Sequence, residues 1–562
     1  MNSLLQLKTQ RIIGLSLLDE ENILEAIKSF EKYMGFLGTF VNADNDTQIK
    51  IVKEITTVKI AFLGKLHNLA KKCIKEKNYD NALICLTEVV RYWSDNVLCL
   101  IDYALCLDKM GQIELRNKII AQLHSVLPKN NPELCKETAL MYEQIGEFEK
   151  AIEYFTKYIN ETQKEKISYN DYSILAGFNY ALYDKTHDIQ YCEKTIENLK
   201  IADSLNPNNK GILRNIIYTA NVMNDYKTQE EYLRKILGIK PICHEDLFHK
   251  SIISLKQKDV KGFYENYDER FVREDKPVWF PNVGNKPMWR GENLADKTLL
   301  VHFEQGFGDT LLMSGFIPRL TKLAKKVIFV VQNHLLSLIG ESFSNIENIE
   351  VLPIQEDVTK LDFDYYIPTM SIPIALDLPV EDLSFDSQYL FANSGLTEEF
   401  KKRFFNNDKL KIGIAFAGNK KVTGNIHLKD IPVSAFLPLD NIEGIELYSL
   451  AKDLTEKDFV DFKNNKVNVL ADYMHDFTYT ASIIDNCDII ISADNVILNL
   501  AGAMNKKTYG LFNWYYEYRW YDLTGEDCGW FKSVKPFVNP KMDDWKTSIS
   551  KVTEEIKQIV EK

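Results

Sequence analysis

Apolar positions in the first half of the chain recur with a helical period and in units of similar length. The clearest unit, LMYEQIGEFEKAIEYFTKYI, spans residues 140–159 and reads as a helix, a tight turn and a second helix. Its characteristic residues are Tyr142, Gly146, Phe148, Ala151 and Phe155. Pro207 and Pro241 end two later units, 34 residues apart. The pattern predicts an array of helical repeats.

Each unit resembles a tetratricopeptide repeat (TPR). Small residues let the paired helices approach, aromatic residues fill the space between them, and prolines stop the second helix. A stack of about five units buries a continuous core and leaves a concave groove for an extended peptide or a partner helix. The alternative is that the array only supports or dimerises the second half of the chain.

The second half instead alternates short apolar runs with helical patterns. We expect strands at 298–303, 326–331, 349–354 and 363–368, and again at 411–418, 445–451, 488–493 and 507–512. Two such sets predict two doubly wound domains that face each other across a cleft. Ligands of these sheets bind beyond the carboxyl ends of the strands.

A glycine-rich loop follows the first of these strands. The stretch HFEQGFGDTLLMSGFIPRL spans residues 302–320, with a helix expected from about Thr310 to Lys325. Gly306 and Gly308 would bring backbone N–H groups close to an anion at the start of that helix. The alternative is a tight turn in which Asp309 caps the helix.

Composition and charge narrow the function classes. A formal charge of −12 and a pI near 5.5 leave no basic face for a phosphate backbone, so nucleic acid is not an expected partner. No apolar stretch approaches the roughly 18 residues that span a bilayer, and the first residues lack a secretory cleavage site. We therefore expect a cytoplasmic chain without a transmembrane segment.

The order of motifs in the second half resembles bacterial TPR-linked members of glycosyltransferase family 9, relatives of the heptosyltransferases. The motifs are W-x-G at Trp289, the glycine loop, IGIAFAGN (412–419), LYSL (447–450), DFTYTASIIDNCDIIISADNVILNLAGAM (476–504) and YEYRWY (516–521). This resemblance implies a TPR-like α-solenoid followed by a GT-B fold of two Rossmann-like α/β domains. It also implies inverting transfer from a nucleotide-diphosphate sugar, with no metal and no further cofactor.

On the acceptor side, the resemblance implies that Asp309 is the general base. A carboxylate within hydrogen-bond reach of an acceptor hydroxyl suits that role. The surrounding acceptor-side loop would be formed by Glu304, Gln305, Gly306 and Gly308.

On the donor side, the resemblance implies a set drawn from the second domain. The residues are Gly418, Asn419, Lys421, Lys429, Thr480, Asp494, Asn495, Asn499 and Arg519. A lysine there would offset charge on the leaving diphosphate; the alternative is a solvated surface lysine. Thr480 borders the nucleotide in the family, or it merely caps a helix. Asn495 and Asn499 replace the family's Thr and His, so donor preference differs or activity is reduced or lost.

The expected boundaries are N-terminal helices at 1–62, repeats at 63–245, a linker at 246–290, an acceptor-side domain at 291–400 and a nucleotide-sugar domain at 401–562. The leading hypothesis is a glycosyltransferase whose array recruits a protein or glycan acceptor or another partner. A catalytically degenerate TPR scaffold is the alternative, and an epimerase is disfavoured by the lack of a GxGxxG fingerprint. Repeat arrays often dimerise through a terminal helix, so a homo-oligomer is compatible with the sequence.

Overall fold

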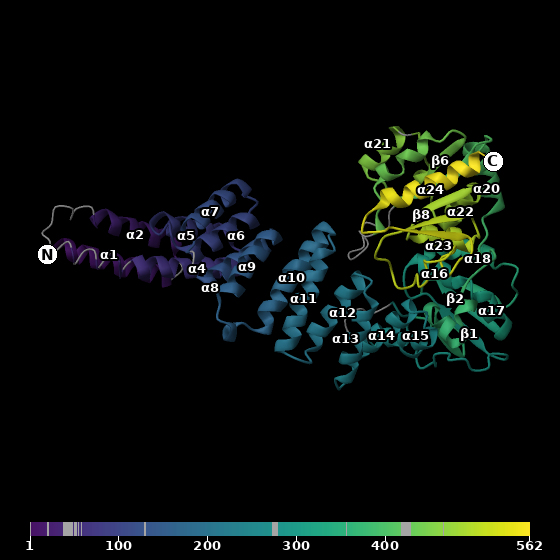
Figure 1. The fold of residues 1–562 in the computed structure, drawn as a ribbon, viewed down its shortest axis with the longest axis horizontal. Coiled ribbons are helices and arrows are strands. Elements are labelled where there is room, and N and C mark those ends of the chain that lie inside the picture. The colour runs from purple at the N-terminus through teal and green to yellow at the C-terminus, as the bar shows by residue number, and fades with distance from the viewer. Residues whose placement is uncertain are drawn as a thin grey trace. The chain divides into compact units, whose positions relative to one another are not determined.

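The computed structural model describes residues 2–19, 22–37, 49, 53, 56–57, 59–128, 131–272, 279–355, 357–416, 429–464 and 466–561. The chain divides into two compact units, Met1–Ile212 and Leu213–Lys562 (Figure 1). The first unit is helical, and the second combines helices with two parallel sheets.

The first unit is built of helix pairs that pack against each other along the sequence. Its helices are α1 (Asn2–Asp19), α2 (Ile23–Leu37), a π-helix η2 (Lys59–Leu63), α4 (Gly64–Lys75), α5 (Tyr79–Tyr92), α6 (Val97–Lys109), α7 (Ile113–Val126), α8 (Pro132–Gln144), α9 (Phe148–Glu161), η3 (Lys164–Lys166), α10 (Tyr169–Thr186) and α11 (Gln190–Leu205). Gly146 has a φ of +77° at the turn between α8 and α9, a conformation that glycine adopts without strain. Ala151 and Phe155 are fully buried at the contact between helices. The predicted TPR-like array is therefore confirmed.

The second unit begins with helices of its own. They are α12 (Lys210–Val222), α13 (Tyr226–Gly238), α14 (His244–Lys256), α15 (Val260–Asn266) and a 3-10 helix η4 (Tyr267–Phe271). The expected linker at 246–290 thus starts with ordered helices. Phe263 and Tyr267 are buried in the same core as the first sheet. The Pro- and Trp-rich stretch near 280 suggests a linker, but the residues before it form helices whose apolar side chains are buried.

The first sheet is parallel, with strand order β3-β2-β1-β4. Its strands are β1 (Thr298–His302), β2 (Lys326–Val331), β3 (Ile349–Pro353) and β4 (Tyr365–Pro368), flanked by α16 (Phe307–Ser314), α17 (Ile317–Leu323), α18 (Leu336–Ser342) and α19 (Ile372–Ala375). Val301 of the central strand β1 pairs with Phe329 and Ile367 on either side. The helix expected over 310–325 starts earlier and is split in two, with Gly315 ending α16.

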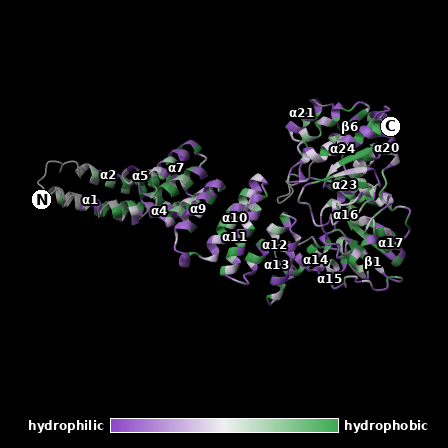
Figure 2. Ribbon diagram, in the orientation of Figure 1, coloured by the Kyte–Doolittle hydropathy of each residue, from purple (hydrophilic) through white to green (hydrophobic). Residues whose placement is uncertain are grey.

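The second sheet is also parallel, in the order β10-β9-β8-β5-β6-β7. Its strands are β5 (Leu410–Ala415), β6 (Ile445–Ser449), β7 (Asn468–Val469), β8 (Ile489–Ala493), β9 (Thr508–Phe512) and β10 (Val534–Val538); its helices include α20 (Ser394–Phe404), α21 (Glu456–Asn464), α22 (Phe477–Asp485), α23 (Val496–Ala503) and α24 (Trp545–Val560). Every residue of β8 and β9 is buried, and Figure 2 shows hydrophobic residues concentrated along the strands of both sheets. The two α/β domains have the GT-B-like arrangement that was predicted.

Candidate active site

The carboxyl ends of the two sheets meet through the helices that follow their central strands. Helix α16 follows β1, helix α23 follows β8, and the two helices pack against each other (Figure 1). At Gly308 a Cβ atom would lie only 2.9 Å from Asn499 Nδ2, so a side chain there would displace Asn499. The glycine of the loop therefore permits a close approach between the two domains.

Asp309 lies in the first turn of α16 and is almost completely buried. Gly306 is the N-cap residue, and its N–H donates to Asp309 Oδ2 over 3.1 Å. Asp309 Oδ1 forms an ion pair with the guanidinium of Arg519. Asp309 is not the N-cap residue itself but the N3 residue of a capping box, so its carboxylate does help to cap α16. The same carboxylate is thus held by one backbone donor and one cation.

Glu304 is a locked, buried carboxylate at the end of β1. Arg270 of η4 donates to it from Nε over 2.9 Å and from Nη2 over 3.0 Å, and the Met370 N–H donates over 2.8 Å. Burial alone would lower the pKa of Arg270, but Glu304, Tyr267 and Asp268 together outweigh it and raise that pKa. Glu304 shapes the loop by anchoring its base. Gln305 contributes its backbone carbonyl, which accepts from Gln332 Nε2 over 3.0 Å.

On the side of the second sheet, Lys429 and Asp494 form an ion pair of 2.8 Å. Glu517 lies 3.8 Å from the same Lys429 Nζ. Burial alone would lower the pKa of Lys429, but Asp494 and Glu517 outweigh it and raise that pKa, so the ammonium stays charged at neutral pH. Lys429 is therefore not a solvated surface lysine.

The two asparagines that depart from the family pattern have different surroundings. Asn495 is the N-cap of α23, and its Oδ1 accepts from the Ile497 N–H over 2.9 Å. Asn499 is buried, and its Nδ2 donates to the Asn495 carbonyl over 3.1 Å. The Oδ1 of Asn499 has no hydrogen-bond partner among the described residues. Asn499 therefore brings an unused acceptor to the contact with Gly308.

Thr480 lies inside α22, where its Oγ1 donates to the carbonyl of Asp476 over 3.0 Å. Asp476 is the capping residue of that helix, so the alternative of a capping role belongs to Asp476. Gly418, Asn419 and Lys421 lie outside the described residues. A nucleotide contact for any of these residues stays a prediction.

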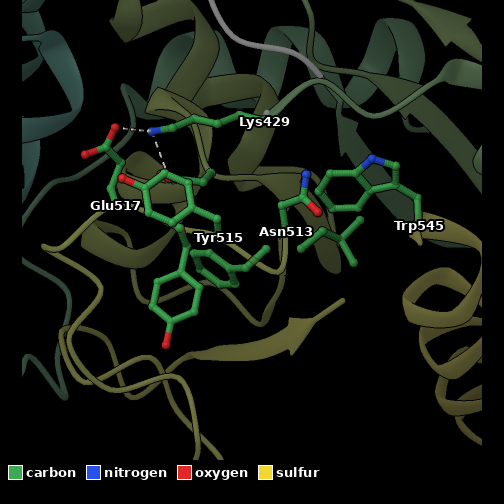
Figure 3. A pocket seen from close by; sticks show the side chains of 9 residues that line it. Lys429, Asn513, Tyr515, Glu517 and Trp545 are labelled. Carbon is green, nitrogen blue, oxygen red and sulfur yellow. Dashed lines mark ion pairs between the residues drawn. The ribbon is translucent and has the colours of Figure 1, made fainter. Parts of the chain in front are cut away.

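A pocket opens where β8 and β9 end, beside the Lys429–Asp494 pair. Its lining consists of Lys429, Asp494, Leu511, Phe512, Asn513, Tyr515, Tyr516, Glu517 and Trp545. Figure 3 shows Lys429 reaching toward Glu517, with Asn513 between Tyr515 and Trp545. The pocket thus combines aromatic rings with one cation and two carboxylates, a composition suited to a polar, ring-containing ligand.

Two contributions were not found from the sequence. Arg270 lies in the segment expected to be a linker, Tyr515 lies outside the quoted motifs, and Tyr516 is only the first residue of the YEYRWY motif. Arg519, expected on the donor side, instead contacts the acceptor-side Asp309. Within the described ranges, no group of three His, Cys, Asp or Glu side chains is arranged to hold a metal.

No family model matches the chain. The chain is 22% identical to Protein FlbA of Caulobacter vibrioides over 344 residues, which is 56% of this chain. It spans about half of that protein, 55% of its length. Among the helices that the structure describes, none is long and apolar enough to cross a membrane.

Solved structures similar to the chain fall into two kinds. ADP-heptose lps heptosyltransferase II of E. coli is 11% identical and covers 47% of this chain and 98% of its own, with a TM-score of 0.33. MamA from Desulfovibrio magneticus RS-1 is 17% identical and covers 31% of this chain and 93% of its own, with a TM-score of 0.25. The membership of glycosyltransferase family 9 inferred from the motifs stays a prediction.

Proposed function

We propose that the two α/β domains form an inverting glycosyltransferase that uses a nucleotide-diphosphate sugar, and that the helical array recruits its protein or glycan acceptor. The observation that carries this proposal is the meeting of two charged sets at facing strand ends. Asp309 follows the central strand of one sheet, and the Lys429–Asp494 pair borders a pocket at the end of the other. Doubly wound sheets bind their ligands at such strand ends.

In the proposed reaction, the Asp309 carboxylate takes the proton of the acceptor hydroxyl. The acceptor oxygen then bonds to the anomeric carbon as the bond from that carbon to the diphosphate oxygen breaks, and the configuration inverts. The nucleoside diphosphate leaves with the bonding electrons, and the ammonium of Lys429 offsets the developing charge.

The contact between Arg519 and Asp309 sets a condition on this reaction. Asp309 Oδ2 already accepts from Gly306, and Oδ1 faces Arg519. An acceptor hydroxyl must therefore displace one of these two donors or share a carboxylate oxygen with it, since each oxygen has two lone pairs.

The test is a thermal-shift screen of the full chain with UDP-, GDP-, ADP- and CMP-linked sugars, followed by measurement of nucleotide release. A ligand that binds the native state raises the unfolding midpoint. We expect one diphosphate-linked donor to shift wild type, Lys429→Met to lose the shift, and Asp309→Asn to keep the shift while losing nucleotide release. The exposed Lys457→Met and Asp453→Asn are the matched controls and should behave as wild type. A shift with CMP-linked sugars alone would contradict the diphosphate, and unchanged release by Asp309→Asn would remove Asp309 as the base.

A second candidate function is a scaffold in which the transferase half has lost catalysis. It is favoured by the engagement of both Asp309 oxygens and by the use of Asn495 as a helix cap. Binding of a nucleotide without turnover of any donor would support this candidate. Saturable release from one donor would exclude it.

A further inference from the structure

The residues after β9 form a link between the candidate site and the helices at the start of the second unit. We call residues 514–522 the aromatic segment. On one side, its Tyr515, Tyr516 and Glu517 line the pocket beside Lys429. Two residues further on, Arg519 contacts Asp309. The conformation of this segment therefore affects both sets of charges in the candidate site.

On the other side, the aromatic segment is held by α12 and by the turn that follows it. Asn221 Nδ2 donates to the hydroxyl of Tyr515 over 3.0 Å. Asn224 Nδ2 donates to the backbone carbonyl of Trp514 over 2.9 Å. Asn224 has a φ of +55°, which asparagine tolerates better than most residues. Both contacts lie within the second compact unit.

Lys256, the last residue of α14, ties these contacts together. Its Nζ donates to Asn221 Oδ1 over 3.3 Å, so one asparagine joins Lys256 to Tyr515. The same Nζ lies 5.3 Å from the centre of the Tyr515 ring, 5.4 Å from that of Tyr516 and 5.9 Å from that of Tyr226. Three rings within 6 Å of one ammonium form a cation–π cage.

The cage surrounds an ammonium that is largely removed from water, and such burial of a charge is unfavourable unless specific contacts stabilise it. Burial lowers the pKa of Lys256 to about 8, and among the charged groups only Glu517 opposes that shift. A second link lies beyond the cage: Lys258 pairs with Asp522 over 2.8 Å. Contacts from α12, from the end of α14 and from the turns that follow these helices thus hold the aromatic segment near both of its ends.

We propose that Asn221 and Lys256 are positioning residues of the nucleotide pocket: they fix Tyr515 and Tyr516 in the pocket wall, so the helices at the start of the second unit support the ligand site. This inference rests on the proposed function, because it assigns the pocket to the nucleotide part of the donor. Neither residue touches the ligand itself. Each acts through the tyrosines that it holds.

The test compares Lys256→Met and Asn221→Ala in the full chain with Lys250→Met, a matched control on the same helix whose ammonium pairs with Glu265 at 3.5 Å. Two quantities are measured: amide hydrogen exchange of peptides covering 514–522, and the Kd for UDP, GDP and ADP by calorimetry. We expect about tenfold faster exchange in the segment and about tenfold weaker binding of the nucleotide that wild type prefers, with the control unchanged. Lys256→Arg keeps the cation over the rings and should restore both values to within about twofold of wild type.

The outcomes separate this inference from the proposed function. Unchanged exchange in Lys256→Met and Asn221→Ala would overturn it, because the segment would then be held without them. Faster exchange with an unchanged Kd would also overturn it, since the tyrosines would not shape the pocket. If wild type binds none of the three nucleotides, the assignment of the pocket fails with the proposed function. The exchange data alone then decide whether the two residues hold the segment.

Discussion

The buried pair of Arg270 and Glu304 gives the sharpest prediction for stability. The Glu304 side chain has no exposed surface, and Arg270 is only 3% exposed. Replacing Arg270 with Met keeps much of the side chain's length and apolar volume but removes the charge. Glu304 would then keep a single donor, the Met370 N–H at 2.8 Å.

The magnitude follows from that loss. Removing one partner of a buried ion pair costs about 3–5 kcal/mol, because the remaining charge has neither water nor a counter-ion. The second substitution in Arg270→Met/Glu304→Gln removes that charge while keeping an acceptor for Met370, so we expect it to recover about half or more of the lost stability. Arg234→Met is the control: Arg234 is paired with Glu230 on an exposed helix face, a contact worth no more than about 0.5 kcal/mol.

Urea unfolding followed by tryptophan fluorescence reports mainly on the second compact unit, which contains Arg270 and Glu304. The sequence has 7 tryptophans, and all except Trp93 belong to the second compact unit. A loss of 3–5 kcal/mol should lower the midpoint for Arg270→Met by about 1–2 M urea, given a slope near 3 kcal/mol/M. A midpoint within about 0.3 M of wild type would refute the reasoning, since Glu304 would then not depend on its cation. A double variant as unstable as Arg270→Met would refute the role assigned to the charge.

Three further predictions concern the packing and titration of the second unit. Burial lowers the pKa of His302 to about 4, so between pH 6.5 and 4 the unfolded chain binds a proton at His302 that the folded chain does not. The free energy of unfolding should therefore fall by about 3 kcal/mol as the pH drops through that window. His302→Asn should lose this pH dependence in urea titrations at each pH. Gly502→Ala should cost about 1–3 kcal/mol in urea unfolding, because its Cβ would lie 2.5 Å from the ring of Phe531. Gly340→Ala, with no atom within 4 Å of its Cβ, should be neutral or stabilising, and equal losses in the two variants would contradict the packing argument. Asp544→Ala should cost about 1 kcal/mol by thermal unfolding, because Asp544 caps α24; an unchanged midpoint would show that the cap contributes nothing.

The fold could be predicted from the sequence because its signals are local. Central parallel strands are buried on both faces, so β1 and β8 read as unbroken apolar runs in the sequence. The repeats show their period in the same way. Strand β10 was missed because Pro536 interrupts it and part of its surface is exposed, which an edge strand tolerates. Strand β7 has only two residues and no pattern to detect.

The contacts of the site could be predicted only in part, because they join side chains that are far apart in the sequence. Arg270 reaches Glu304 across 34 positions, and Lys256 reaches the tyrosine rings of the aromatic segment. No local period marks such residues. Arg270 follows Asp268 and Glu269 in the short helix η4, and such a run of charged residues usually lies on a solvated surface, so the sequence gives no sign that Arg270 is buried.

The ion pair between Asp309 and Arg519 is a further contact that no local sequence pattern predicts. The motifs assigned them to opposite sides of the cleft, as base and as donor contact, yet they form one ion pair across 210 positions. The consequence is electrostatic coupling between the two sides. An anionic ligand that attracts Arg519 weakens its hold on the Asp309 carboxylate, and an acceptor hydroxyl that takes the place at Oδ1 releases Arg519. If the site is a transferase, binding of donor and acceptor should therefore favour each other, and Arg519→Gln should reduce that mutual effect even where each ligand still binds alone.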